Sequence, residues 1–213
     1  MMQLHYYPSN ASMVPHLVLE EIGAPCELVL VDRRESAHKS AAYLALNPNG
    51  LIPVFIDGDL VLYETAAICL HLADTHPQAA LAPALGTPAR AHSYKWLMWL
   101  TNTLQATLIV YFYPERWAET PEAVEQVKAH AEARIGGMLD QLDAELARVG
   151  GAWFTGESFS VLDPYVLTLC RWTRGFGRPA RKLPNLGPYL QRVLARPASQ
   201  RVFEREELAQ PWV

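Results

Sequence analysis

Apolar and polar residues alternate along residues 2–7, and a second apolar stretch covers residues 27–32. Alternation with a period of two is typical of strands, so both segments are predicted to be short strands. Residues 13–22 between them have a helical pattern, preceded by Ser12 and followed by Gly23. Serine is favoured just before a helix and glycine just after one. The first thirty residues therefore predict a strand–helix–strand unit.

A hairpin is predicted next along the chain. The apolar runs 54–56 and 60–62 flank Asp57-Gly58-Asp59, and Asp-Gly between two β-forming runs is a strong hairpin signal. A weak helix around Ser40–Leu46 precedes the hairpin, and a helix from Glu64 to His76 follows it. This order predicts one small mixed sheet with helices on its faces.

The pattern changes after residue 78. Residues 78–89 are rich in Ala, Pro and Gly, which is typical of a linker, and no strand pattern follows them. Helices are predicted instead over residues 90–108 (continuing toward Trp117), 121–149, 162–173, 185–195 and 198–208. The predicted organisation is an α/β domain at residues 1–78, a linker at 79–88 and an all-helical domain at 89–213.

Composition narrows the class of protein. The 213 residues include 18 Lys and Arg against 22 Asp and Glu, a formal charge of −4, and half of them are hydrophobic. A slightly acidic chain argues against a nucleic-acid partner, which needs a basic face. Three cysteines far apart form no disulfide or metal-binding pattern, which fits a reducing cytoplasm and predicts no metal. The longest apolar run, Leu104–Tyr113, is too short to cross a bilayer, and no signal peptide is visible.

Four local motifs carry a family resemblance. They are residues 6–12 with Pro15-His16, residues 47–54 (Asn-Pro-Asn-Gly-Leu-Ile-Pro-Val), residues 63–68 (Tyr-Glu-Thr-Ala-Ala-Ile) and residues 160–163 (Ser-Val-Leu-Asp). Each is weak alone, but in this order and spacing they make the whole chain resemble the cytosolic glutathione transferase superfamily. Its nearest resemblance is to bacterial members of the beta and theta-like type.

The resemblance implies both a fold and an activity. The implied fold is a thioredoxin-like N-terminal domain, βαβ then ββα around a mixed four-stranded sheet, followed by an all-helical domain. The implied activity is conjugation of the glutathione thiolate to hydrophobic electrophiles, with glutathione as co-substrate and no metal. Family members are mostly two-fold dimers, so a homodimer is expected.

The resemblance also implies a glutathione site on the first domain. In the family a cis proline follows the residue whose backbone pairs with the cysteinyl unit, and Pro53 and Ile52 match these two. Glu64 and Thr65 match the pair that opens a helix, where free N–H groups suit a carboxylate and the acid suits the γ-glutamyl ammonium. Further binding residues are expected at Ser9, His38 and Lys39.

The residue that activates the thiol is expected near the start of the first helix. Beta-type members have a cysteine at the position of Ala11, and its absence argues against a mixed disulfide with glutathione. Theta-type members use a serine in this turn, whereas other classes use a tyrosine on the first strand. Ser12 is therefore the first candidate, Asn10 the second and Tyr6 the third.

The electrophile is expected against the helical domain, where aromatic residues crowd the stretch before residue 117. Tyr111, Tyr113 and Arg116 are the predicted pocket wall. Beta-type members have a His-Lys pair on this helix, where this chain has Gln105-Ala106. That difference argues against beta-type disulfide or hydrolytic chemistry.

Two other functions remain open. One is a glutathione-dependent reductase of disulfides or peroxides, in which Asn10 or Ser12 only orients glutathione. The other is a binding protein that has kept the fold and lost catalysis. The intact Pro53, Glu64 and Thr65 count against the binding protein, because a scaffold has no need of a glutathione site.

Overall fold

The computed structural model describes residues 1–213, which form two compact units. The N-terminal unit consists of residues 1–82 together with 195–210, and the helical unit consists of residues 83–194 together with 211–213. Residues 195–210 therefore group with the sheet, whereas the sequence placed them in the helical domain. Local patterns could not show this, because the contacts that hold this segment are made with residues at the other end of the chain.

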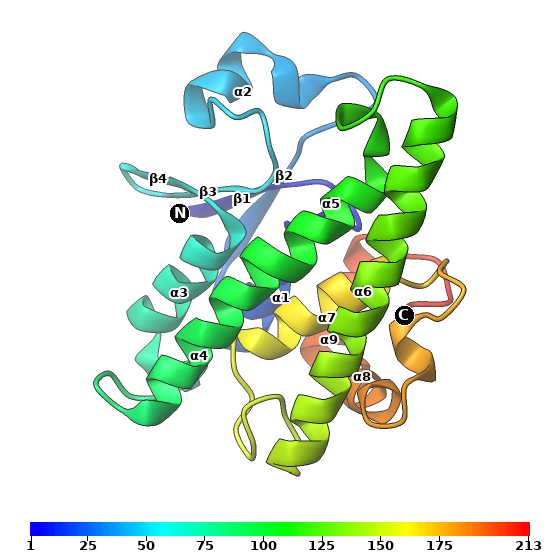
Figure 1. The fold of residues 1–213 in the computed structure, drawn as a ribbon. Coiled ribbons are helices and arrows are strands. Elements are labelled where there is room, and N and C mark those ends of the chain that lie inside the picture. The colour runs from blue at the N-terminus through cyan, green and yellow to red at the C-terminus, as the bar shows by residue number, and fades with distance from the viewer. The chain divides into compact units, whose positions relative to one another are not determined.

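The N-terminal unit contains one four-stranded sheet in the order β2-β1-β3-β4 (Figure 1). Its strands are β1 (Met2–Tyr6), β2 (Cys26–Leu30), β3 (Val54–Asp57) and β4 (Leu60–Tyr63). β1 pairs with β2 in parallel, and β3 pairs antiparallel with both β1 and β4. The predicted mixed sheet, hairpin and fold class are confirmed.

Helices cover both faces of this sheet. α1 (Met13–Ile22) and α3 (Thr65–Thr75) contact each other on one face, against the fully buried Leu4 and Phe55. α2 (Ala41–Leu46) lies on the other face, where Tyr43 and Val54 belong to one core cluster (Figure 1). Side chains alternate along a strand, so neighbouring positions of β1 and β3 contribute to different cores.

The ends of α1 follow the sequence pattern only in part. Gly23 ends the helix in the left-handed conformation, with φ 71°, and its N–H donates to the Leu19 carbonyl. Ser12 occupies the position before the helix, but its side chain makes no capping hydrogen bond. The predicted serine cap is therefore wrong, because the hydroxyl is bonded to backbone groups of the preceding turn.

α9 (Pro197–Arg205) packs against α1 within the N-terminal unit. Arg196 pairs with Glu21 at 2.5 Å, and Arg201 pairs with Glu20 at 2.7 Å. Just past the helix, the buried carboxylate of Glu206 contacts His16 at 2.9 Å. α9 is thus attached to α1 by ion pairs along its exposed side and by one polar contact in the core.

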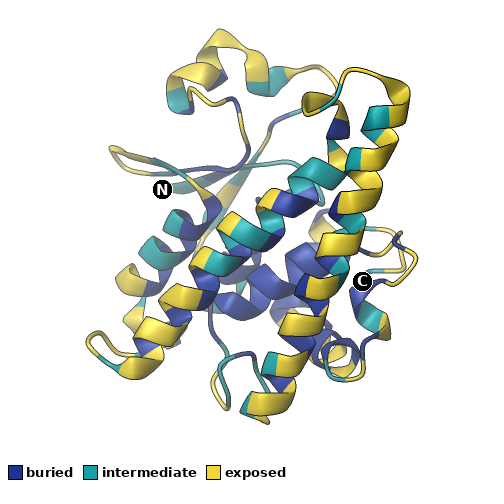
Figure 2. Ribbon diagram, in the orientation of Figure 1, coloured by how far each residue is buried: buried dark blue, intermediate teal, exposed yellow.

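The helical unit is built from five α-helices: α4 (Pro88–Trp99), α5 (Ala106–Phe112), α6 (Pro121–Val149), α7 (Leu162–Trp172) and α8 (Leu186–Leu194). A π-helical segment, residues 100–105, joins α4 to α5, which the sequence did not predict. α6 is buried along one side and exposed along the other, whereas α7 is buried almost all round (Figure 2). No helix combines the length and apolar character needed to span a membrane.

Asp163 organises the start of α7. Its carboxylate accepts hydrogen bonds from the Phe154 and Ser160 N–H groups, at 2.9 and 2.8 Å, and from the Tyr189 hydroxyl at 2.8 Å. The Ser160 hydroxyl in turn accepts from the Leu162 N–H. This reciprocal arrangement is a capping box with Asp in place of Glu, as the sequence indicates.

Candidate functional site

The pairing register of the sheet brings four segments to one end of it. His5 faces Val54, and Val54 faces Tyr63, so residues 6–7, 52–53 and 64 continue beyond the same end. Tyr6 faces Leu30 in the parallel pair, so the segment after β2 leaves from this end too. Most of the residues predicted to bind glutathione belong to these segments, which the fold thus brings together.

The loop before β3 is held by two side chains. The buried Asn47 amide and the Tyr43 hydroxyl both donate to the Leu51 carbonyl at 2.8 Å. The Ile52–Pro53 peptide bond that follows is cis. Ile52 lies outside the registered strand pairs, which leaves its backbone at the end of the sheet where an extended peptide could pair with it.

Lys39 and His38 lie against the same loop. Gly50 has φ 59°, and a Cβ at this position would stand 2.8 Å from the Lys39 Nζ and 3.0 Å from the His38 carbonyl. Burial, with Arg33 and Lys39 nearby, lowers the pKa of His38, so its ring is neutral at pH 7. The Lys39 ammonium lies beside this loop, and the neutral His38 ring adds no charge to it.

Glu64 is held in an unusual backbone conformation, with φ 75° and ψ 110°, immediately before α3. A non-glycine residue at positive φ stores backbone strain, of the order of 1–3 kcal/mol, and such residues cluster at functional sites. Its exposed side chain does not cap the helix. The buried Thr65 follows as the first residue of α3. The carboxylate of Glu64 is thus presented at a helix start without an internal partner.

The turn between β1 and α1 distinguishes the candidate activating residues. Ser12 is fully buried; its hydroxyl donates to the Tyr7 carbonyl and accepts from the Tyr7 N–H, each at 3.2 Å. A serine hydroxyl has one proton. Because that proton bonds the backbone of the turn, Ser12 holds the turn together in this structure and has no donor left for a ligand.

Unlike Ser12, Asn10 has side-chain hydrogen-bond donors that remain free. Its side-chain oxygen accepts from the Ala11 N–H at 2.7 Å, which fixes the orientation of the amide. The NH₂ end has two donors, and no hydrogen bond within the chain engages it. The side chain is half-buried, so the NH₂ group is both oriented and accessible.

Ser9 is positioned by a residue that sequence reasoning missed. It has φ 61°, and its N–H donates to the Glu206 carboxylate at 2.8 Å. Glu206 also contacts Nδ1 of His16 at 2.9 Å and is buried. No motif near residue 206 indicates this role, because both partners lie about 190 residues earlier in the chain.

Tyr6 faces the α1 side of the sheet. Its ring lies 6.2 Å from that of His16, in an edge-on arrangement. Burial raises the pKa of Tyr6, and the carboxylates of Glu206 and Glu207 raise it further. Its neighbour Tyr7 instead packs against the core cluster that contains Ile52.

The residues predicted to contact the electrophile lie in the helical unit. Tyr111 packs against Phe176, with ring centroids 4.2 Å apart, and the Arg116 guanidinium lies 4.2 Å from the centre of the Tyr113 ring. Burial, together with Glu132, raises the pKa of Tyr111. Gln105 accepts a hydrogen bond from the Tyr165 hydroxyl at 2.7 Å, so its amide serves packing inside this unit.

The arrangement suits a flexible peptide anion. It offers an open backbone beside a cis proline, a cation at one side, a carboxylate at a helix start and a neutral donor at the start of α1. No group of His, Cys, Asp and Glu side chains in the structure is arranged to hold a metal ion. The donors in this arrangement can bind, orient and hydrogen-bond to an anion.

Comparison with known proteins identifies the family of this chain. The family model of the glutathione S-transferase N-terminal domain matches residues 2–74, and that of the C-terminal domain matches residues 100–197. Glutathione S-transferase GstA of Escherichia coli O157:H7 is 28% identical over 210 residues, which cover 97% of this chain and 100% of that protein. GstB of E. coli K12 is 34% identical over 191 residues, 87% of this chain and 89% of GstB.

Solved structures of glutathione transferases are also similar to this chain. A glutathione transferase homologue from Sulfitobacter with bound glutathione has a TM-score of 0.89 and 27% identity, with 98% of this chain and 99% of that one covered. A sphingomonad glutathione S-transferase complexed with glutathione has a TM-score of 0.84 and 32% identity, with 97% and 100% covered. The fold and these matches define a class of protein whose solved members include structures with bound glutathione. The chain belongs to the glutathione transferase family.

Proposed function

We propose that this protein conjugates the thiolate of glutathione to hydrophobic electrophiles. The observation that carries the proposal is the convergence, at one end of the sheet, of Ile52-Pro53, the unpartnered carboxylate of Glu64 and the free NH₂ group of Asn10. Each of these matches one chemical feature of glutathione: its peptide backbone, its ammonium group and its thiol.

Binding is assigned to the segments around β3 and α3. The Ile52 backbone pairs with the cysteinyl unit, and Lys39, with the neutral His38 as a hydrogen-bonding neighbour, binds the glycyl carboxylate. The Glu64 carboxylate binds the γ-glutamyl ammonium, and the N–H of Thr65 at the start of α3 binds the γ-glutamyl carboxylate. Ser9 is assigned to the binding turn through its backbone, since its N–H is bonded to Glu206.

Activation is assigned to Asn10 ahead of Ser12 and Tyr6. A free thiol has a pKa of ~8.5, and lowering it by about two units requires roughly 2.7 kcal/mol of preference for the thiolate. One hydrogen bond to an anion contributes ~1.5–3 kcal/mol, and a helix N-terminus adds ~0.3–1 kcal/mol. A single amide donor at the start of α1 is therefore sufficient. Ser12 lacks a spare proton, and Tyr6 lies beside carboxylates that oppose a second anion.

The proposal has three further parts: the residues that contact the electrophile, the homodimer and the cytoplasmic location. We assign Tyr111, Tyr113 and Arg116 to contact with the electrophile, because aromatic rings bind apolar ligands well and Arg116 already stacks on a ring. The family membership supports a homodimer in the cytoplasm. Glutathione is the co-substrate.

A calorimetric titration with glutathione and with S-hexylglutathione tests the glutathione site. We expect both to bind, and the alkylated ligand to bind more tightly because its chain buries apolar surface. Glu64→Gln should weaken both by roughly tenfold or more, since a neutral amide loses a charge-assisted bond. Glu125→Gln, an exposed acid on α6, is the matched control and should change neither. Absence of binding by either ligand rejects the proposal.

The ultraviolet absorbance of the bound thiolate, followed against pH, tests the activating residue. We expect Asn10→Ala to raise the pKa of the bound thiol and to slow conjugation of 1-chloro-2,4-dinitrobenzene by about tenfold to a hundredfold. Ser12→Ala should lower stability and leave that pKa unchanged. A shift in Ser12→Ala with none in Asn10→Ala returns the activating role to Ser12.

One observation favours a second activity, reduction of disulfides by glutathione. A donor such as Asn10 that only orients the thiolate also permits that thiolate to attack a disulfide, which forms a mixed disulfide and expels one thiol. A second glutathione then attacks the mixed disulfide, which gives oxidised glutathione and expels the other thiol. An assay with hydroxyethyl disulfide and glutathione separates the two activities. Turnover with the disulfide and none with the chloroarene would replace the first proposal by the second.

A further inference from the structure

Asn47 lies at the end of α2, in the loop that leads to β3, and only 2% of it is exposed. A buried amide side chain needs hydrogen-bond partners, because an unpaired polar group costs free energy. Tyr43, one turn earlier on α2, is buried as well and belongs to the same core cluster as Ile52. The loop is therefore attached to the face of the sheet that α2 covers (Figure 1).

Asn47 forms hydrogen bonds in both directions along the chain. Its backbone N–H donates to the Tyr43 carbonyl, and its carbonyl accepts from the Gly50 N–H, each at 2.9 Å. The side-chain oxygen accepts from the Asn49 N–H at 3.1 Å, and the side-chain NH₂ group donates to the Leu51 carbonyl at 2.8 Å. This one residue thus holds the second half of the loop in place.

The second half of the loop, residues 49–51, lies between two parts of the proposed glutathione site. Ile52, whose backbone is assigned to the cysteinyl unit, directly follows Leu51. Lys39, which is assigned to the glycyl carboxylate, lies against Gly50, where a Cβ would stand 2.8 Å from its Nζ. The loop conformation therefore sets how far the Lys39 ammonium lies from the Ile52 backbone.

We propose that Asn47 is a positioning residue for glutathione, and that it favours a peptide with a glycyl unit over one that lacks it. The inference rests on the proposed function, from which it takes the binding roles of Ile52 and Lys39. A loop that is already held in one conformation binds its ligand without a further cost of ordering. Without the Asn47 side chain, residues 49–51 lose two hydrogen bonds, and the two contacts lose their fixed separation.

Calorimetric titration with glutathione and with γ-glutamylcysteine tests the proposal, because the second peptide lacks only the glycyl unit. We expect the native protein to bind glutathione more tightly by roughly tenfold or more, since the glycyl carboxylate reaches Lys39. Asn47→Ala should weaken the binding of glutathione by roughly tenfold, and that of γ-glutamylcysteine by at most about threefold. The preference for glutathione should therefore fall.

The kinetics of conjugation separate positioning from activation of the thiol. In Asn47→Ala the KM for glutathione should rise, whereas kcat at saturating glutathione and the pKa of the bound thiol should stay unchanged. The reason is that Asn10, the proposed donor to the thiol, belongs to a different segment, between β1 and α1. A shift of the thiol pKa as large as that in Asn10→Ala would overturn the positioning role and assign Asn47 to activation.

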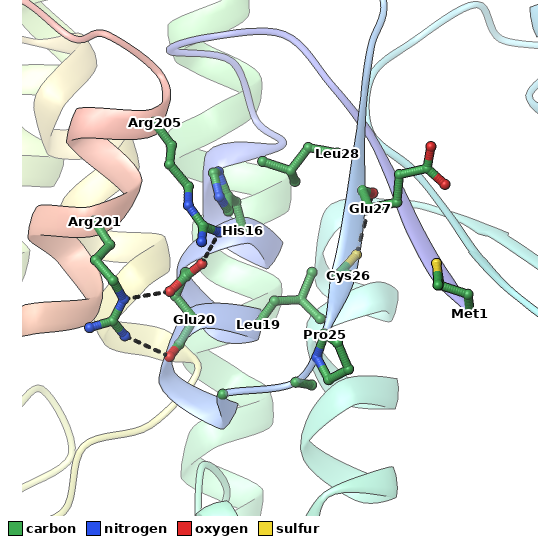
Figure 3. Close-up of a pocket in the computed structure, with 12 residues that line it drawn as sticks. Met1, His16, Leu19, Glu20, Pro25, Cys26, Glu27, Leu28, Arg201 and Arg205 are labelled. Carbon is green, nitrogen blue, oxygen red and sulfur yellow. Dashed lines mark hydrogen bonds and ion pairs between the residues drawn. The ribbon is translucent and has the colours of Figure 1, made fainter.

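Two control variants should leave both affinities unchanged. Asn49→Ala removes an exposed amide from the same loop and keeps the N–H that donates to Asn47. Arg201→Gln removes the ion pair with Glu20 that joins α9 to α1, on the other face of the sheet (Figure 3).

Tyr43→Phe is the milder test of the same loop. It removes only the hydroxyl, which donates to the Leu51 carbonyl beside the Asn47 amide. We expect it to reduce the preference for glutathione in the same direction as Asn47→Ala, by a smaller factor. It decides the question where Asn47→Ala does not fold.

Three further outcomes overturn the inference. They are equal weakening of both peptides by Asn47→Ala or by Tyr43→Phe, unchanged binding of glutathione by both variants, and an effect of Asn49→Ala as large as that of Asn47→Ala. Each leaves the proposed transferase function standing, because the native protein still binds glutathione. Failure of the native protein to bind either peptide rejects the proposed function and this inference together.

Discussion

Asp163 in the helical unit and Glu206 in the N-terminal unit are both buried carboxylates, yet their partners lie at different distances along the chain. Three of the four groups that donate to Asp163 come from Phe154 and Ser160, within nine residues. Glu206 contacts Ser9 and His16, 197 and 190 residues away. A locally bonded carboxylate leaves a motif in the sequence, whereas a distantly bonded one leaves none.

The largest loss of folding stability is expected from Asp163→Ala. Removing this carboxylate leaves four buried donors without an acceptor, and each costs ~1–3 kcal/mol, so we expect a loss of about 4 kcal/mol or more. Urea unfolding followed by tryptophan fluorescence measures it, since all six tryptophans lie in the helical unit. Asp163→Asn, which retains one acceptor oxygen, should lose less. Equal stability of the Ala variant and the native protein would contradict this role.

The pKa of Asp163 predicts an unusual dependence of folding stability on pH. Burial raises the pKa of Asp163 to about 6, from 3.8. Because the folded state holds the proton more tightly than the unfolded state does, this group favours folding most below pH 3.8, and the contribution is lost as the pH rises to about 6. At ~1.4 kcal/mol per pKa unit the change is at most about 3 kcal/mol.

The free energy of unfolding, measured between pH 4 and 7, tests the direction of this pH dependence. The difference between the native protein and Asp163→Asn should fall with rising pH, because only the native protein titrates at this position. A difference that rises over the same window would mean that the donors around Asp163 outweigh its burial.

Glu206→Ala should cause the next largest loss of folding stability, about 2–3 kcal/mol, because the Ser9 N–H and His16 lose their buried acceptor. We also expect weaker glutathione binding, since Ser9 belongs to the turn that holds Asn10. Hydrogen exchange at α1 and glutathione titration measure the two effects. Glu204→Ala, an exposed acid on α9, is the control. Unchanged exchange at α1 would show that Glu206 does not support this turn.

The smallest loss of folding stability is expected from Arg196→Gln. Its ion pair with Glu21 is partly exposed, and such pairs contribute ~0–1 kcal/mol. Thermal unfolding in low and high salt measures it. A loss as large as that of Glu206→Ala would mean that the ion pairs, and not the buried contact, hold α9 in place.

Most elements of the fold could be predicted from the sequence. The helices at Met13–Ile22 and Pro121–Val149 have the predicted bounds, because Gly23 and Gly150 end them in the left-handed conformation that glycine favours. The hairpin follows from Asp57-Gly58. The loop before Pro53 could be recognised too, since Asn47 and Tyr43 bond it from within ten residues.

Other features depend on contacts that no local pattern encodes. The π-helical segment at residues 100–105 sits inside an ordinary helical pattern. The hydroxyl of Ser12 was expected to serve the thiol, but which of several nearby groups a serine bonds is decided by the shape of the turn. Glu206 is one acid among several near the end of α9, and only the folded chain shows that it is buried.

The grouping of residues 195–210 with the sheet has a consequence for synthesis on the ribosome. The first 82 residues emerge more than a hundred residues before the segment that covers α1. Until then, the polar surface that Glu206 later pairs with stays in water, and the turn at residues 9–12 lacks its support. We therefore expect the nascent N-terminal unit to remain protease-sensitive at α1 until α9 has been translated, whereas the sheet itself can form early.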